Sequence, residues 1–366
     1  MPIVHPERAS RCRRRATEGS NSMKALVIRS FGGPEVLSFE DMDAPRATPD
    51  HVVVRVAAAG VNYYDILIRS GIISRDIALP HIGGSDVVGE IAEVGDGVSD
   101  WREGDKVIVS PGYPTKPEER GHVPENEASS YFPTGTFERG GFAQFMLVDQ
   151  RWLLRDNTGL PPEELATMPL ALVTAVHAVK TLGQVTPGSR ILVQAGASGS
   201  GTMAIQVAKA MGAQVITTVS TAAKAEVARR MGADEIVFYK DLDVANAVLE
   251  WTGGAGVDAV IDPVGGITLA DSLNSLKPRG IVVNFGLTGG AEATIPHLYP
   301  FFRSERRLVG SWMGSMEELR FGLDLVRQGR INAALDKTLP LSRGAEAQRQ
   351  LSAAQVAGKI ALLPWA

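Results

Sequence analysis

The chain of 366 residues is long enough for two domains of ordinary size, each with its own core. Hydrophobic residues make up 44% of it and charged residues 21%, which is the balance of a globular cytosolic protein. The formal net charge of −4 gives no broad electrostatic reason to bind nucleic acid or an anionic membrane. No apolar run approaches the ~18 residues that span a bilayer.

Residues 1–22 differ in texture from the rest of the chain. Five arginines gather there without hydrophobic periodicity, before Met23 opens an apolar run. We expect a disordered leader; a start at Met23 or an Arg-rich organelle transit peptide are the alternatives. The single cysteine, Cys12, also lies there, so the chain can form neither an internal disulfide nor a thiolate-rich zinc site.

From Met23 to about Asp149 the sequence consists of short aliphatic runs and turns. Glycine, proline and aspartate separate the runs. Strands this short at this spacing predict a compact barrel or sandwich. The predicted strands include Val52–Val56, Val87–Ile91, Lys106–Val109 and Phe145–Val148.

The middle third of the chain alternates between buried strands and helices. Strands joined by helices require right-handed crossovers, which give a parallel, doubly wound sheet, so the fold class is α/β. The predicted strands are Ile191–Val193, Val215–Val219, Glu235–Phe238, Asp258–Ile261 and Gly280–Phe285. The predicted helices are Met203–Met211, Ala222–Met231, Asp243–Trp251 and Thr268–Leu276.

A glycine-rich turn, residues 195–201, joins the first of these strands to its helix. Without Cβ atoms the backbone can turn tightly and approach a pyrophosphate, whose charge the exposed amides and the helix N-terminus stabilise. Glycine clusters also occur in ordinary strand–helix loops, but the surrounding alternation favours a dinucleotide site. The predicted cofactor-binding residues of the turn are Gly196, Ala197, Ser198, Gly199, Ser200 and Gly201.

The end of the next strand distinguishes between dinucleotides. An NAD-binding protein usually carries Asp or Glu there, to accept from the ribose 2′-hydroxyl. Here Ser220 and Lys224 follow the strand, and the first acid is Glu226. A carboxylate would repel a 2′-phosphate, whereas Ser220 can hydrogen-bond to it and Lys224 can neutralise it. The segment favours NADPH, with an ordinary solvated helix residue as the alternative for Lys224.

Three further segments, Phe31–Leu37, Ala59–Gly71 and Gly358–Leu362, resemble the quinone oxidoreductase branch of the medium-chain dehydrogenase/reductase superfamily. The resemblance implies a GroES-like β-rich catalytic domain of residues 23–153 and 291–366. It also implies a Rossmann NADPH-binding domain of residues 154–290, with the active site in the cleft between the two. We further expect a cytoplasmic homodimer or homotetramer acting on a small molecule, with no nucleic-acid or membrane partner.

The zinc-dependent alcohol dehydrogenases of that superfamily place catalytic zinc ligands where Asn62, Ser85 and Leu170 stand here. Asn and Ser are poor zinc ligands and Leu is none, so no metal is expected. Residues 110–142 are as long as the loop that carries a structural zinc in those enzymes. Its four cysteine positions are taken by Thr115, Glu118, Gly121 and Ser129.

Without a metal to polarise a carbonyl, hydride transfer favours an acceptor that is already electrophilic, such as a quinone or an enone. Asn62 can donate its amide to a substrate oxygen or to the nicotinamide ribose. Tyr64 matches the position of a proton-relay Ser or Thr in zinc enzymes, so its phenol is a candidate proton donor. The alternative is that Tyr63 and Tyr64 only pack. Asp65 is expected to be a structural partner or cap.

The resemblance adds further cofactor residues from four other segments. Thr174 matches a helix beside the nicotinamide, and Tyr239 matches a tyrosine near the adenosine phosphate. Val264 lies at the carboxyl edge of the sheet, where ligands bind. Phe285, Gly286 and Leu287 end the next strand along the nicotinamide. Trp312 and Phe301–Phe302 line either the cleft or a subunit contact, and His177 is expected to pack within its helix.

The sequence therefore predicts an NADPH-dependent quinone or enone reductase that works without a metal. One alternative is an alcohol dehydrogenase-like NADP enzyme with degenerate zinc sites. The other is a weakly catalytic, crystallin-like protein that binds NADPH.

Overall fold

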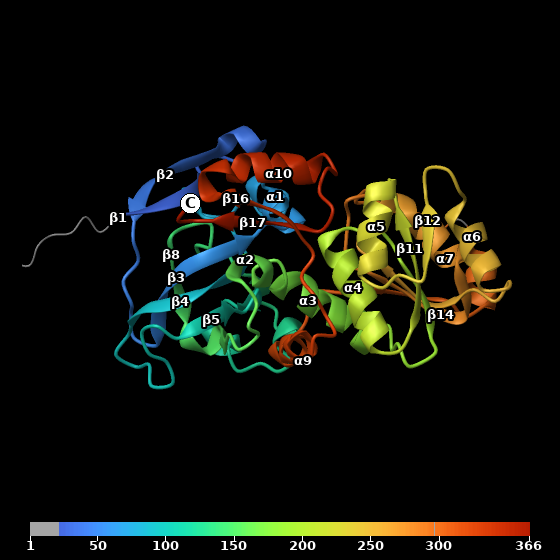
Figure 1. Ribbon diagram of the computed structural model, residues 1–366, viewed down its shortest axis with the longest axis horizontal. Helices are drawn as coiled ribbons and strands as arrows, with labels where there is room; N and C mark the ends of the chain where they lie inside the picture. The colour runs from blue at the N-terminus through green and yellow to red at the C-terminus, as the bar shows by residue number, and fades with distance from the viewer. Residues whose placement is uncertain (1–21, 296) are drawn as a thin grey trace, which may run out of the picture.

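A computed structural model describes residues 22–295 and 297–366, which form two lobes side by side (Figure 1). The expected leader of residues 1–22 lies outside the described residues, apart from Ser22 at the start of β1 (Ser22–Ile28). Within the described ranges, no helix is long and apolar enough to cross a membrane.

The first lobe is β-rich, as expected, and its main sheet brings together strands from both ends of the chain. The C-terminal strand β17 pairs with β3 near the start, so the last residues complete the lobe. Three side chains of β3 that face the core, Val52, Val54 and Val56, are fully buried. In the described chain the sheet contains β16 (Leu335–Pro340), β17 (Lys359–Leu363), β3 (His51–Gly60), β4 (Asp86–Val94), β5 (Lys106–Val109), β9 (Leu153–Arg155) and β8 (Phe145–Asp149). Smaller pairings join β1 to β2 (Leu37–Asp43) and β6 (Gly112–Pro114) to β7 (Tyr131–Pro133).

The second lobe confirms the predicted parallel, doubly wound sheet. Its strand order is β12-β11-β10-β13-β14-β15, so the order reverses beside β10. Both faces are buried, as a parallel sheet requires, because helices cover each side. The strands are β10 (Arg190–Val193), β11 (Gln214–Val219), β12 (Glu235–Phe238), β13 (Val257–Asp262), β14 (Leu276–Asn284) and β15 (Arg307–Gly310). The helices are α4 (Gly199–Ala210), α5 (Ala222–Arg230), α6 (Val244–Trp251) and α7 (Leu269–Asn274).

The parallel sheet extends beyond residue 290, where the sequence places the boundary of this domain. Strand β15 pairs in parallel with β14 and forms the edge of the sheet. Its Arg307 and Leu308 are exposed, so the segment lacks the buried apolar run by which the other strands are recognised.

Helices α3 (Pro169–Val176) and α9 (Met316–Arg327) join the lobes, and α3 lies between them in Figure 1. Their approach is close, because a Cβ on Gly322 of α9 would lie 2.7 Å from Leu172 Cγ of α3. A wider helical turn, His177–Leu182, continues α3. The remaining helices are α1 (Tyr63–Arg69), α2 (Pro162–Leu165), α8 (Leu298–Arg303) and α10 (Gly344–Ser352).

Candidate cofactor groove and acceptor cleft

The glycine-rich turn leaves β10 at the carboxyl edge of the sheet, beside the point where the strand order reverses. Ser198 caps α4 by accepting a hydrogen bond from Gly201 N at 3.0 Å. A Cβ on Gly196 would lie 2.0 Å from Thr217 Oγ1, and one on Gly201 would lie 2.2 Å from the Ala195 carbonyl oxygen. Gly196 and Gly201 are thus needed for the tight packing of the turn, and the residues between them line a groove.

This groove has a volume of about 440 Å³ and follows the turn. Its first wall belongs to the parallel sheet and contains the predicted Ser220, Lys224, Tyr239 and Val264. Its second wall is the connection from α10 to β17, from Leu351 to Lys359. The walls are joined where Gly358 N donates to the Ala197 carbonyl at 2.8 Å. Sequence reasoning did not assign this second wall, although the Gly358–Lys359 pair lies in a segment that supports the family resemblance.

The far end of the groove is basic. Burial, and then repulsion from Lys240, lowers the pKa of Lys224. Lys224 Nζ donates to the Ala354 carbonyl at 2.8 Å, which links the two walls. No Asp or Glu lines the groove among the residues that the structure describes. A phosphate-bearing ligand therefore fits the charge of this end.

A second cavity of about 200 Å³, here called the acceptor cleft, adjoins the groove. Asn62, Tyr63 and Ser200 line both spaces. Four predicted cofactor residues, Thr174, Phe285, Gly286 and Leu287, line the cleft. Trp312 lines it as well, which places this side chain at the cleft, whereas Phe302 is 63% exposed on α8.

A buried polar cluster lies where the two spaces meet. Lys359 Nζ donates to Asp86 Oδ2 at 2.8 Å and also to Asn62 Oδ1. Asn62 Nδ2 donates to the same Asp86 oxygen at 2.9 Å. The second Asp86 oxygen accepts from Leu170 N at 2.6 Å. Because the Asn62 side chain both donates to Asp86 and accepts from Lys359, its amide is held in one orientation.

Asp65 acts as a cap rather than lining either space. Its Oδ2 accepts from Asn62 N at 2.7 Å, at the start of α1. Burial raises the pKa of Asp65 to about 7, although the Asn62 amide and the charge of Lys359 oppose this change. The carboxyl therefore supports the backbone that presents Asn62 and Tyr64.

Tyr64 is half-buried in the wall of the acceptor cleft. Burial raises the pKa of its phenol to about 12, so the group is protonated at neutral pH. Thr136 Oγ1 donates its hydrogen to the Pro133 carbonyl and lies 3.4 Å from Tyr64 Oη. At 3.4 Å the contact with Thr136 is weak, so a ligand oxygen in the cleft can accept the phenolic hydrogen in its place.

At the positions that match metal ligands in zinc enzymes, the residues here make other contacts. Asn62 is bonded to Lys359 and Asp86, Leu170 contributes only a backbone amide, and Ser85 is fully buried. In the ranges 22–295 and 297–366, no group of three or more His, Cys, Asp or Glu side chains is arranged to hold a metal ion.

The loop of residues 110–142 is closed by hydrogen bonds. Glu119 accepts from Ser129 Oγ at 2.6 Å and from Ser130 N at 2.7 Å, and these bonds lower its pKa to about 2. Thr115 Oγ1 donates to the Ser130 carbonyl at 3.1 Å. Two of the four positions that match structural cysteines, Thr115 and Ser129, thus take part in this closure.

A GroES-like lobe packed beside a doubly wound dinucleotide lobe, with a groove and a cleft between them, defines a two-domain nicotinamide-dependent oxidoreductase. Two family models match the chain: an alcohol dehydrogenase GroES-like domain over residues 48–161 and a zinc-binding dehydrogenase domain over residues 199–328.

Similar proteins extend over almost the whole chain. A quinone oxidoreductase of Pseudomonas aeruginosa is 31% identical and covers 93% of this chain and 99% of its own length. The crystal structure of an NAD-dependent alcohol dehydrogenase is 32% identical in sequence with a TM-score of 0.88. The match covers 93% of this chain and 99% of that one. The structure of a crotonyl-CoA carboxylase/reductase in complex with NADP is 26% identical with a TM-score of 0.83. The match covers 94% of this chain and 95% of that one. The chain belongs to the medium-chain dehydrogenase/reductase superfamily and is quinone-oxidoreductase-like, a family whose members bind a nicotinamide cofactor.

Proposed function

We propose that this protein is an NADPH-dependent oxidoreductase that reduces a quinone or an α,β-unsaturated carbonyl without a metal ion. The observation that carries the proposal is the Asn62–Asp86–Lys359 cluster. It sets an amide donor and a buried ammonium beside the acceptor cleft, and the amide stands at a position that matches a zinc ligand in the zinc enzymes. This donor set suits an acceptor oxygen that gains negative charge through conjugation.

The bound cofactor would supply the hydride, and the chain's own residues would orient the acceptor and exclude water. Asn62 has two amide hydrogens, and in the described structure one is bonded to Asp86. The second can donate to an acceptor oxygen or to the ribose. The Tyr64 phenol can hydrogen-bond to the developing enolate or hydroquinone oxygen, and it is the proposed proton donor.

Two features of the groove support NADPH over NADH. Ser220 and Lys224 line its far end with Tyr239, and Lys240 lies close enough to affect the pKa of Lys224. No carboxylate lines the groove in the described residues that could accept from a ribose 2′-hydroxyl. Among the similar proteins, one binds NADP and another is NAD-dependent, so the preference depends on these side chains.

The function is tested by following NADPH oxidation with 1,4-naphthoquinone, an enone and a simple aldehyde, beside an assay of bound metal. We expect turnover of the quinone and the enone, little with the aldehyde, and weak activity with NADH. Preferential reduction of the aldehyde, with stoichiometric zinc, would support the alcohol dehydrogenase alternative. Tight NADPH binding with no turnover would support the crystallin-like alternative.

We also propose that the protein forms a homodimer through the exposed edge of its parallel sheet. Strand β15 has no further partner in the described residues. Its Leu308 and the α8 residues Leu298, Tyr299 and Phe302, which precede it in the chain, are at least 40% exposed. Sedimentation at micromolar concentration tests this, and a purely monomeric species would contradict it. The cytoplasmic location stays a prediction.

A further inference from the structure

The segment Ser311–Ser315 runs from β15, at the edge of the parallel sheet, to α9 between the lobes, along the edge of the acceptor cleft. Ser311, Trp312 and Met313 line the cleft. The Trp312 side chain is 43% exposed, so burial alone does not fix its position. Part of the side chain is accessible from the cleft, and the contacts that hold the segment fix where it lies.

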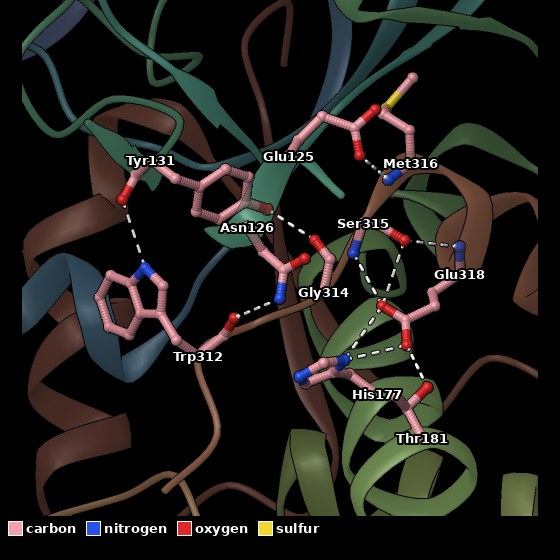
Figure 2. Close-up of polar contacts among 10 residues, drawn as sticks. All are labelled: Glu125, Asn126, Tyr131, His177, Thr181, Trp312, Gly314, Ser315, Met316 and Glu318. Atoms are coloured by element: carbon pink, nitrogen blue, oxygen red, sulfur yellow. Dashed lines mark hydrogen bonds and ion pairs between the residues drawn. The ribbon is translucent and has the colours of Figure 1, made fainter. Parts of the chain in front are cut away.

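Residues 125–131 of the loop hold this segment from one side (Figure 2). Two of the contacts reach Trp312 itself: its Nε1 donates to the Tyr131 carbonyl at 3.2 Å, and its carbonyl accepts from Asn126 Nδ2 at 3.4 Å. Tyr131 Oη donates to the Gly314 carbonyl at 2.9 Å. Glu125 Oε2 accepts from Met316 N at 3.1 Å. The loop therefore holds the crossing segment through three hydrogen bonds, at Trp312 and Gly314, and holds the first residue of α9 through a fourth.

Glu318 holds the other end of the segment (Figure 2). It accepts from Ser315 N at 2.8 Å, forms a capping box at the start of α9, and also bonds to His177 Nδ1 and Thr181 Oγ1. Burial alone would raise the pKa of Glu318, but hydrogen bonds from His177, Thr181 and Ser315 lower it to about 2. The carboxylate is thus ionised at neutral pH, and the segment is fixed to the turn that follows α3.

The consequence is a defined position for the indole ring. Trp312 meets Tyr64 edge to face, with ring centroids 6.2 Å apart, and meets Phe132 in the same way at 6.4 Å. These are the preferred arrangements of aromatic pairs. Trp312 therefore forms a corner of the cleft with the proposed proton donor, and the rest of this wall is apolar, with Leu67, Ile73 and Pro133.

We propose that Trp312 is a specificity-determining residue for the acceptor, and that Glu125, Asn126 and Tyr131 are positioning residues that hold it. The proposal rests on the proposed function and deepens it: the favoured acceptor is a planar aromatic quinone, or an enone bearing an aryl group. A fused ring can pack against the accessible part of the indole, whereas a short aliphatic enone lacks the surface to gain from it.

The test compares 1,4-naphthoquinone with methyl vinyl ketone in steady-state kinetics. Trp312→Ala should lower kcat/KM for the naphthoquinone about tenfold, mainly through KM, and change that for methyl vinyl ketone less than about twofold. Tyr131→Phe keeps the ring but removes the donor to Gly314, so it should cause a smaller loss, about threefold, with the same selectivity.

Tyr113→Phe is the matched control for Tyr131→Phe. Tyr113 lies on β6 of the same two-stranded pairing, and its phenol bonds to Glu138 at 2.9 Å instead of to the crossing segment. It should leave the ratio of the two kcat/KM values unchanged. Equal losses for both acceptors in Trp312→Ala, or the same shift in Tyr113→Phe as in Tyr131→Phe, would overturn the proposal.

A binding measurement separates this proposal from the proposed function. With NADP⁺ in place of NADPH no reduction occurs, and calorimetry can measure the Kd of 1,4-naphthoquinone alone. Trp312→Ala should raise this Kd about tenfold, and an unchanged Kd would overturn the role of Trp312. Absence of turnover in the unaltered protein would count against the proposed function and leave this binding test in force.

Discussion

The glycine-rich turn and the buried polar cluster beside it are built in different ways. The glycine-rich turn is one run of seven residues between a strand and a helix. Gly196 and Gly201 meet their packing partners within the same lobe, and Gly199 lies against Lys359 of the other lobe. The buried cluster joins Asn62, Asp86 and Lys359, and its outer members are 297 positions apart in the chain. A contiguous site is visible in a sequence, whereas a site assembled by strand pairing becomes visible only with the register of the strands.

That register explains how the cluster forms. Gly60, at the end of β3, lies opposite both Asp86 of β4 and Ala361 of β17. Asn62 follows β3 by two residues, and Lys359 begins β17. Three ordinary polar residues are therefore brought together because two strands pair with the same end of a third. Substitutions in the cluster are therefore expected to affect folding, and substitutions beside the glycine-rich turn to affect cofactor binding.

The largest effect is expected from Lys359→Met. The substitution leaves the fully buried Asp86 without its cation, which should lower the free energy of unfolding by about 3–5 kcal/mol in urea denaturation. Adding Asp86→Asn should restore part of the loss, because no charge then remains buried.

Lys277→Met provides the control for Lys359→Met. Its ion pair with Asp258 is partly exposed, so its loss should cost no more than about 1 kcal/mol. Equal losses of unfolding free energy in Lys359→Met and Lys277→Met would show that the cluster stabilises the fold no more than a surface ion pair does.

The second effect concerns pH and Asp65. Its pKa is raised from 3.8 to about 7 in the folded chain. Between these pH values the folded state keeps a proton that the unfolded state has already released. Stability from this group is present below pH 4 and is lost as the pH rises to 7, by up to about 4 kcal/mol at about 1.36 kcal/mol per pKa unit. Unfolding of the Asp65→Asn variant should lack this decline, and parallel pH profiles of the two proteins would refute the assignment.

The smallest effect is expected on the sheet side of the groove. Lys224→Ala should weaken NADPH binding about 10- to 100-fold, because the 2′-phosphate loses a charged partner, and should change the Kd of NADH less than about twofold. Lys209→Ala is the control, since that lysine bonds to Asp234 away from the groove. A similar loss for both dinucleotides would remove the argument for NADPH and leave the groove as a general dinucleotide site.

The sequence predicts the fold class and the glycine turn well because both depend on local patterns. Strand–helix alternation, buried runs and glycines at a strand end are properties of neighbouring residues. Asp65 as a cap is local too, since its partner Asn62 is three positions away.

Features that depend on distant contacts could not be predicted. Lys359 looks like an ordinary residue of a terminal strand until β17 is placed beside β3. Strand β15 is exposed and charged, so its membership of the parallel sheet depends on pairing with β14. The sequence does not distinguish between the cleft and a subunit contact for Trp312, and its contacts with Tyr131 and Asn126, more than 180 positions away, place it at the cleft.

The central claim is that the cofactor reduces a conjugated acceptor directly, without a metal. Reduction of 2-cyclohexenone with NADPH deuterated at the transferred position of C4, in the presence of a chelator, tests it most directly. The expected product is cyclohexanone carrying one deuterium at the β-carbon, formed at the same rate with and without the chelator. Deuterium at the carbonyl carbon of an allylic alcohol, with activity abolished by the chelator, would contradict it.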